Sequence, residues 1–148
     1  MSYWIFKCRP TDGSQDGYRF DDRMADSEPN VTWRVTRYAD KIRAGDVAFI
    51  WKTGKSRGIY AVMAIDGDPQ PLEESPNENS YNVPPDHELK MRVTGRFIKR
   101  LAGITSKALR GISGLENLSV FHGFQQATNF LVSDEEGRII MSLIEDSE

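Results

Sequence analysis

The sequence predicts a mixed α+β domain, built on a curved or barrel-like sheet with short helices at its flanks and a capped helix at the C-terminus. Most apolar segments have the length and alternation of strands, and Val47–Trp51 and Ile59–Ile65 enclose a short polar loop, as in a β-hairpin. Strands with non-local partners beside a few short helices favour this fold class. With 148 residues and no internal repeat or linker, residues 1–148 are expected to form one domain.

The first half of the chain begins with a strand, Tyr3–Cys8, whose alternation sets Trp4, Phe6 and Cys8 on one face. Residues 10–30 are polar and predict a loop with at most one helical turn. A short apolar segment around Trp33 follows, and residues 36–43 are expected to form a brief helix.

The second half begins with the hairpin. Residues 66–88 are rich in Pro, Asn, Asp and Glu and predict an excursion on the surface. The next segment alternates strictly, so we expect Leu89, Met91 and Val93 to point inward and Arg92 outward. Further along are a short helix candidate at residues 106–110, a loop and strand within residues 121–131, and a final helix with a capping box of Ser133 and Glu136.

Charge is unevenly distributed along a chain whose net charge is −3. Residues 89–115 contain no acidic side chain but several basic ones, and the hairpin loop adds Lys52, Lys55 and Arg57. Such asymmetry can create a local phosphate-binding surface on an acidic protein, although each single base is by itself consistent with a solvated face.

Several function classes are excluded or disfavoured. A single cysteine, Cys8, forms no internal disulfide and fits a reducing cytoplasm, and with two histidines it makes a poor metal inventory, so no metal or cofactor is expected. No apolar run is long enough to span a membrane. The segment Lys52–Ser56 resembles a nucleotide-binding P-loop, but it lacks the upstream glycine and precedes a strand, so nucleotide hydrolysis is rejected. A Cys8–His122 nucleophile is disfavoured because Cys8 lies in an apolar strand pattern.

Two tryptophans are candidates for ligand binding. Trp33 lies in a short segment between polar residues, and Trp51 ends a strand at the basic loop. Aromatic side chains at such positions can stack on a flat base, whereas the commoner role of an aromatic residue is to fill the core.

The chain resembles the EVE domain family, a branch of the PUA-like superfamily related to YTH domains. The matching pieces are residues 3–7, Trp33 with Arg37 and Tyr38, Ile42 with Gly45-Asp46, residues 49–51, and residues 58–61; residues 118–131 and the terminal helix also fit. The resemblance covers nearly the whole chain. It implies a non-catalytic module that reads a modified, methylated nucleobase in DNA or RNA, with links to restriction or RNA modification.

The resemblance also implies where the base binds. Trp33 and Trp51 are expected to face each other across a slot closed by the loop from Gly54 to Gly58, with Lys7 and Cys8 at a strand end near the ligand. The full predicted base-binding set is Trp33, Trp51, Lys7, Cys8, Arg37, Tyr38, Gly54, Gly58 and Asn129, where Asn129 would read a base edge. The predicted phosphate-binding set is Lys52, Lys55, Arg57, Arg92 and Arg96. A monomer is favoured.

Two alternatives remain open. The first is a PUA-like hydrolase of acylated nucleosides, for which Lys7 is available as the catalytic amine but no partner is assigned. The second is a general RNA-binding accessory protein without preference for a modification.

Overall fold

The computed structural model describes residues 1–122 and 127–146 of the chain. Its elements in chain order are β1 (Tyr3–Cys8), β2 (Gly17–Tyr18), α1 (Phe20–Ala25), β3 (Asn30–Arg34), β4 (Val47–Lys52), β5 (Gly58–Ile65), β6 (Gln70–Leu72), α2 (Pro76–Asn79), β7 (Asn82–Val83), β8 (Lys90–Thr105), α3 (Ser106–Arg110), the 3₁₀ helix η1 (Ser119–Phe121), β9 (Asn129–Val132) and α4 (Asp134–Asp146). Among these helices, none has the length and apolar character needed to cross a membrane.

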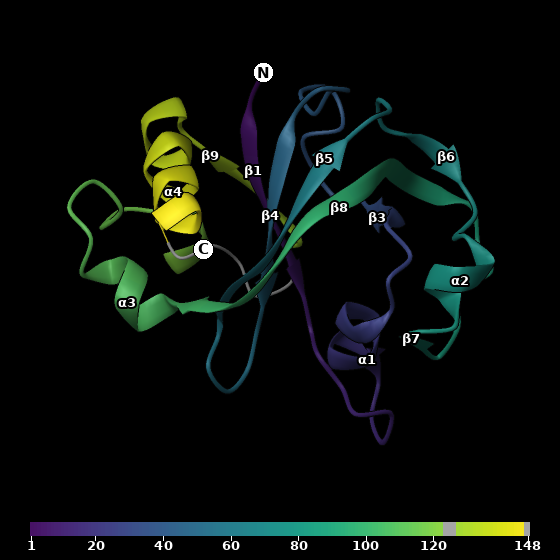
Figure 1. Ribbon diagram of the computed structural model, residues 1–148. Coiled ribbons are helices and arrows are strands. Elements are labelled where there is room, and N and C mark those ends of the chain that lie inside the picture. Colours follow the sequence, from purple (N-terminus) through teal and green to yellow (C-terminus); the bar gives the residue numbers. More distant parts are fainter. Residues whose placement is uncertain (123–126, 147–148) are drawn as a thin grey trace.

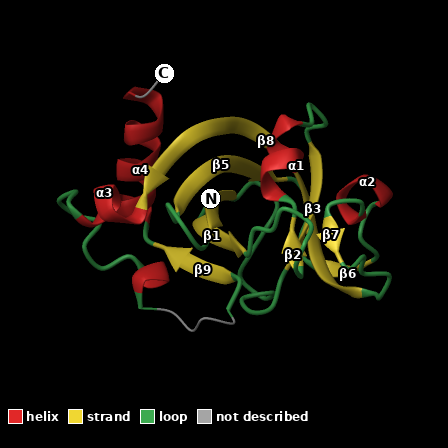
Figure 2. Ribbon diagram, turned by 90° about the horizontal axis from the view of Figure 1, so that it is seen from below, coloured by secondary structure: helices red, strands yellow, loops and turns green. Residues whose placement is uncertain are grey.

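A strongly curved sheet of seven strands runs through the molecule (Figure 1). Its order is β3-β8-β5-β4-β1-β9, and β6 adds to β8. All neighbours are antiparallel except β1 and β4, which are parallel. Seen from below, β5 and β8 arch over β1, and a separate two-stranded sheet joins β2 to β7 (Figure 2). The predicted α+β fold with a curved sheet and short helices is therefore confirmed.

The sheet is open rather than closed into a barrel. Within the described residues, β3 and β9 are the two ends of the strand order and share no ladder. The side chain of Asn129 bridges this seam instead: its Oδ1 accepts a hydrogen bond from the backbone N–H of Thr36 at 2.7 Å. Its Nδ2 donates to the backbone carbonyl of Arg34 at 3.3 Å. One buried amide thus connects two edges that the backbone leaves apart.

The two faces of the sheet bury two separate cores. Alternation along β1 sends Trp4 and Phe6 into the first core, inside the curve, and Ile5 into the second. The second core lies under α4, which contributes Ile140 and Ile144. Every one of these five side chains is at most 1 % exposed. Period-two alternation therefore decides which core each residue joins.

Two predicted elements are confirmed in detail. The hairpin pairs β4 with β5 from Val47 opposite Ala64 to Lys52 opposite Gly58. The capping box precedes α4, since the backbone N–H of Ser133 donates to Glu136 Oε1 at 3.0 Å and the N–H of Glu136 donates to Ser133 Oγ at 3.1 Å.

Three local predictions are wrong. Residues 36–43 form turns rather than a helix, because Tyr38 has a φ of 65° while its ring packs 5.3 Å from that of Trp4. The excursion at residues 66–88 folds into β6, α2 and β7 and buries Glu78. In β8 the expected alternation fails, since Met91 is exposed and Arg92 is fully buried among acidic partners.

Candidate functional site

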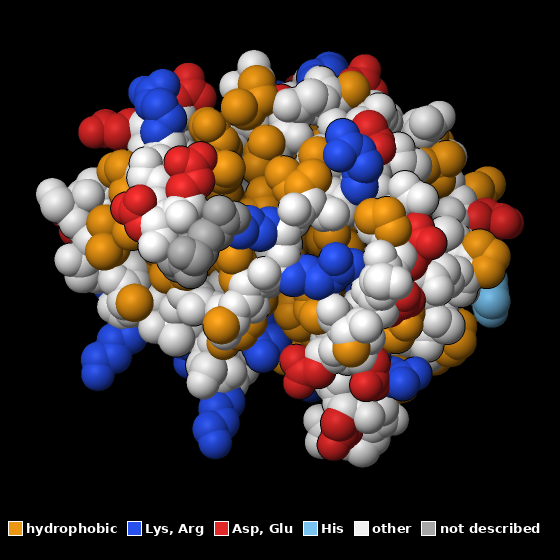
Figure 3. Space-filling view, viewed as in Figure 1, with side chains coloured by type: hydrophobic (Ala, Val, Ile, Leu, Met, Phe, Trp, Pro, Cys, Tyr) orange, Lys and Arg blue, Asp and Glu red, His pale blue; other side chains and the backbone are white. Residues whose placement is uncertain are grey.

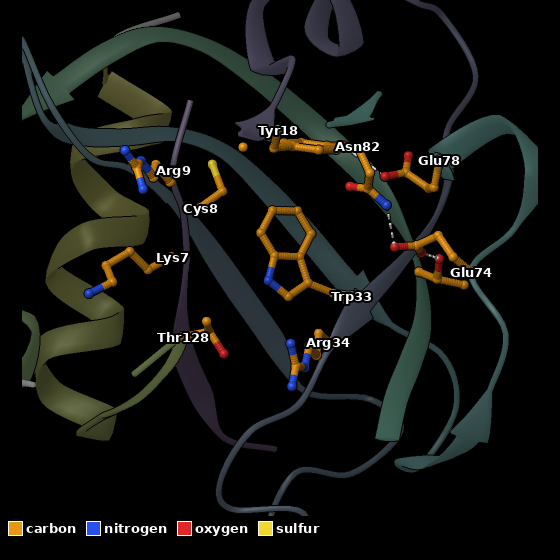
Figure 4. Close-up of a pocket in the computed structure, with 12 residues that line it drawn as sticks. Lys7, Cys8, Arg9, Tyr18, Trp33, Arg34, Glu74, Glu78, Asn82 and Thr128 are labelled. Atoms are coloured by element: carbon orange, nitrogen blue, oxygen red, sulfur yellow. Dashed lines mark hydrogen bonds between the residues drawn. The ribbon is translucent and has the colours of Figure 1, made fainter. Parts of the chain in front are cut away.

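A pocket of about 250 Å³ lies where β1 and β3 end, and we call it the Trp33 pocket. The pair β2–β7 and helix α2 close its other side (Figure 4). Its lining residues are Lys7, Cys8, Arg9, Gly17, Tyr18, Thr32, Trp33, Arg34, Glu74, Glu78, Asn82 and Thr128. This volume is below the range of drug-sized ligand sites, so the pocket suits a single small ring system.

Trp33 forms the aromatic wall of this pocket and is itself held by two other rings. Phe6 stacks on the indole with centroids 6.3 Å apart and planes at 25°. Tyr18 meets it edge-on, with centroids 5.7 Å apart and planes at 74°. The side chain is only 8 % exposed, so a ligand can reach one limited face of the ring.

An acidic wall stands opposite the basic rim of the pocket. Glu78 is buried, and it accepts hydrogen bonds from the Tyr18 hydroxyl at 2.7 Å and from Nε of Arg23. Burial raises the pKa of Glu78 despite these bonds, and burial beside Glu78 also raises the pKa of Tyr18. Glu74 accepts from the Thr32 hydroxyl and from Asn82 Nδ2, the latter at 3.0 Å. The donors on this side of the pocket are thus already directed at carboxylates.

Basic side chains surround the opposite side. Lys7, Arg9 and Arg34 all line the pocket, and partial burial together with the charge of Arg37 lowers the pKa of Lys7. Cys8 lies between them, and burial raises the pKa of its thiol to about 12, which makes it a poor nucleophile at neutral pH.

A second hollow, of about 650 Å³, lies on the other side of the β1 end, and we call it the hairpin hollow. Its lining residues are Lys7, Cys8, Arg9, Trp51, Thr53, Gly54, Arg57, Ser106, Arg110, Val120, Phe121 and Thr128. Lys7, Cys8, Arg9 and Thr128 are shared with the Trp33 pocket. Figure 3 shows basic side chains in the hollowed centre of this face and others projecting at the β4–β5 tip and near α3.

The expected slot between two tryptophans is not formed. Trp33 packs in the first core and Trp51 in the second, on opposite faces of the sheet. Trp51 is 3 % exposed and meets Phe121 edge-on at 6.2 Å, at the wall of the hairpin hollow. The reason is the side-chain alternation of β4, which sends Ala48 and Ile50 into the first core and Phe49 and Trp51 into the second.

Four other residues predicted to contact the base have structural roles within the protein instead. Asn129 is fully buried at the seam. Arg37 donates from Nε to the carbonyl of Asn129 at 2.7 Å, and Tyr38 packs on Trp4. At Gly58, an added Cβ would lie 2.1 Å from the carbonyl oxygen of Ile104, so close strand crossing explains this glycine. Of the predicted base-binding set, Lys7, Cys8 and Trp33 meet in the Trp33 pocket, while Trp51 and Gly54 lie in the hairpin hollow.

The predicted phosphate-binding set is also divided. Lys55 and Arg57 are exposed at the hairpin tip, beside Lys107 and Arg110 of α3. Lys52 is held in the fold, its Nζ 4.1 Å from the Tyr60 ring centroid and 3.8 Å from Asp21.

Arg92 and Arg96 do not join this basic surface. Arg92 is fully buried and donates to Asp86 at 3.0 Å, because its strand runs beneath the structured excursion. Arg96 is exposed near Asp66 but pairs with Ala64, six residues along β5 from the tip.

The acidic wall is the part of the site that sequence reasoning missed. Its residues Glu74, Glu78 and Asn82 all come from the excursion expected to be surface loop. One signal was available: Ser75-Pro76-Asn77-Glu78 has the pattern of a helix start with proline in the first turn. The side chain of Ser75 does accept from the N–H of Glu78, at 3.3 Å. In the described part of the chain, no cluster of His, Cys, Asp or Glu is arranged to hold a metal ion.

The open curved sheet, with its parallel pair of β1 and β4 and the small pocket at the end of β1, defines a small mixed α+β domain with a candidate ligand site. The EVE domain model matches residues 2–143, and the chain belongs to the EVE domain family. Among curated proteins, none matches the sequence.

Three solved structures illustrate the shared fold. Human THYN1, in complex with DNA containing 5-methylcytosine, has 18% sequence identity and a TM-score of 0.69 over 98% of each chain. A protein from Leishmania major has 18% identity and a TM-score of 0.68 over 99% of this chain and 96% of its own. The ZmASCH protein from Zymomonas mobilis is more distant, with 10% identity and a TM-score of 0.52 over 96% of each chain. At these identities the likeness concerns the fold.

Proposed function

We propose that this domain is a non-catalytic reader of modified nucleic acid that holds one flipped, methylated base in the Trp33 pocket. The observation that carries the proposal is a small pocket with an indole on one side, hydrogen-bonding groups on the other, and cations at its rim. Flipped bases are recognised by this combination of stacking and polar contacts to the base edge. Human THYN1, which has the same fold, is bound to DNA containing 5-methylcytosine, and this supports a methylated base as the ligand.

The binding free energy is expected to come from contacts to the flipped base and from contacts to the phosphates of the nucleic-acid backbone. Stacking of a base on one aromatic ring contributes about 1–3 kcal/mol, whereas a buried methyl group contributes about 0.8 kcal/mol. Arg9 and Arg34 at the rim would contact the phosphates next to the flipped nucleotide. Arg57 and Arg110 in the hairpin hollow would hold phosphates further along the strand, so affinity should fall as salt rises.

The test compares two equivalent substitutions, Trp33→Phe and Trp51→Phe. Binding to oligonucleotides with and without one 5-methylcytosine is measured by fluorescence anisotropy, in DNA and RNA forms. Trp33→Phe reduces stacking in the pocket and should weaken binding of the methylated oligonucleotide about fivefold. Trp51→Phe makes the same chemical change in the other core and should leave the affinity for the methylated oligonucleotide unchanged.

Two results would contradict this proposal. Equal affinity for methylated and plain oligonucleotides, with a steep dependence on salt, would indicate general nucleic-acid binding. An equal loss of affinity for the methylated oligonucleotide in both tryptophan variants would place the base elsewhere.

A second candidate function is hydrolysis of a small acylated nucleoside, since Lys7 and two carboxylates line one pocket. The lowered pKa of Lys7 also favours it. Figure 4 shows the Lys7 amine on the far side of Trp33 from Glu74 and Glu78, which favours the reader instead. Turnover of N4-acylcytidine that disappears in Lys7→Ala would support the hydrolase.

A further inference from the structure

The orientation of one amide defines the hydrogen-bonding character of the Trp33 pocket. Asn79 Oδ1 accepts a hydrogen bond from the backbone N–H of Asp86 at 2.7 Å, which identifies that atom as the oxygen. Asn82 Nδ2 donates to this oxygen at 3.1 Å and to Glu74 Oε2 at 3.0 Å. Both amide protons of Asn82 are therefore engaged by oxygen atoms of the protein, and the orientation of the amide is determined by this network.

The Asn82 oxygen is left as an acceptor facing the ligand space. Figure 4 shows the Asn82 nitrogen turned toward Glu74 and its oxygen turned to the other side, toward Trp33 and Tyr18. Within the described residues, no hydrogen bond reaches this oxygen. Asn82 is partly exposed and lines the pocket, so the oxygen is accessible to a ligand.

The neighbouring groups on this wall are acceptors as well. The hydroxyls of Thr32 and Tyr18 donate to Glu74 and Glu78, and Arg23 donates to Glu78. These contacts direct the donors of the wall at carboxylates and leave oxygen lone pairs toward the pocket. A base carbonyl placed there would meet oxygen atoms, whereas an amino group would donate to them.

We infer that the Asn82–Glu74 wall selects bases with an amino group at the position of cytosine N4 or adenine N6, and rejects thymine, uracil and guanine, which carry a carbonyl oxygen at that position. The inference rests on the proposed function, since it assigns the base edge that faces this wall. Selection works by hydrogen-bond polarity: the N4 amino group of cytosine or the N6 amino group of adenine donates to Asn82 Oδ1. The O4 of thymine or O6 of guanine would leave two acceptors opposed without a proton between them.

The most direct probe is the pair of 5-methylcytosine and thymine. Both bases carry the same methyl group on C5, and they differ in the hydrogen-bonding pattern of the edge, with an amino group or a carbonyl at position 4. Single-stranded oligonucleotides identical except for this one base are compared by fluorescence anisotropy. The wild-type chain should bind the 5-methylcytosine oligonucleotide at least about tenfold more tightly than the thymine one.

Asn82→Ala tests whether this wall is responsible. The substitution removes the acceptor, so the ratio between the two oligonucleotides should fall to about a third of its wild-type value or less. Asn117→Ala, an exposed asparagine outside the pocket lining, is the matched control and should keep the wild-type ratio. Circular dichroism and thermal melting confirm that each variant is folded.

The outcomes separate this inference from the proposed function. If binding depends on Trp33 but the two oligonucleotides bind equally, or Asn82→Ala keeps the full ratio, edge selection by Asn82 is wrong and the reader function stands. If no oligonucleotide binds in a Trp33-dependent manner, both are wrong.

Discussion

Replacing Asn129 by alanine should lower the free energy of unfolding by about 2–3 kcal/mol. The fully buried side chain makes two hydrogen bonds to backbone groups across the seam, to the N–H of Thr36 and the carbonyl of Arg34. Each contributes about 1 kcal/mol, and the backbone groups that lose their partner add to the loss. For a chain of this size the melting temperature should fall by about 5–10 °C.

Urea denaturation followed by tryptophan fluorescence measures this change, and amide hydrogen exchange locates it. The amide proton of Thr36 should exchange much faster in Asn129→Ala, because its acceptor is gone, while amides in the β4–β5 hairpin stay protected. The control is Thr128→Ala, whose hydroxyl contacts Asn129 Oδ1 at 3.1 Å and the Thr36 hydroxyl at 2.9 Å, so its removal costs side-chain contacts and leaves the hydrogen bonds of Asn129 to the backbone in place. A loss below about 0.5 kcal/mol in Asn129→Ala, or equal losses in both variants, would refute the seam argument.

Three further predictions concern other parts of the fold. Glu78→Gln leaves the guanidinium of Arg23 buried without its anion and should lower the free energy of unfolding by about 3–5 kcal/mol in urea denaturation. Because burial raises the pKa of Cys8 to about 12, its alkylation by iodoacetamide at pH 8 should be about a thousandfold slower in the folded than in the unfolded chain. Gly137→Ala should lower the melting temperature although alanine favours helices, because the new Cβ would lie 2.1 Å from the Tyr3 ring.

Each of these has a control or a contradicting outcome. Glu88→Gln changes a carboxylate that is 79% exposed and should alter stability by less than about 0.5 kcal/mol. Cys8 alkylation at the rate of the unfolded chain would show that the thiol is accessible and ionisable. Gly111→Ala adds a Cβ at an ordinary contact distance of 3.5 Å, so a loss equal to that of Gly137→Ala would contradict the packing argument.

The parts of the fold that the sequence predicts are those where local pattern and burial agree. The hairpin, the alternation of β1 and the capping box of α4 each follow from a few neighbouring residues. The predictions of a helix around Tyr38 and of an outward-facing Arg92 are wrong because both residues depend on contacts that are distant in the sequence. A non-glycine residue with positive φ and a buried arginine both depend on distant partners, which are Trp4 in one case and Asp86 with Glu74 in the other.

The candidate site was predictable only in part. Trp33, Lys7 and Cys8, which the resemblance to EVE domains indicates as base-binding residues, all line one pocket, and their contact with a base stays a prediction. The pairing of Trp33 with Trp51 failed because the sequence does not show which faces of two strands that are not neighbours, β3 and β4, point to the same core; plain alternation along β4 places Trp51 with Phe49 in the second core. The acidic wall was missed because a polar, proline-rich segment is typical of exposed loops, whereas here it packs over two buried arginines, Arg23 and Arg92.

The connection between β5 and β8 begins and ends at two strands that pair directly with each other in the sheet. This one stretch of chain carries all of Glu74, Glu78 and Asn82, so it could be exchanged as a unit, together with β6 and β7, without altering the strand order β3-β8-β5-β4-β1-β9. The arginines beneath it belong to α1 and β8 and would remain after such an exchange. Any replacement segment must therefore bring carboxylates to Arg23 and Arg92, while its remaining positions are free to change the lining of the Trp33 pocket.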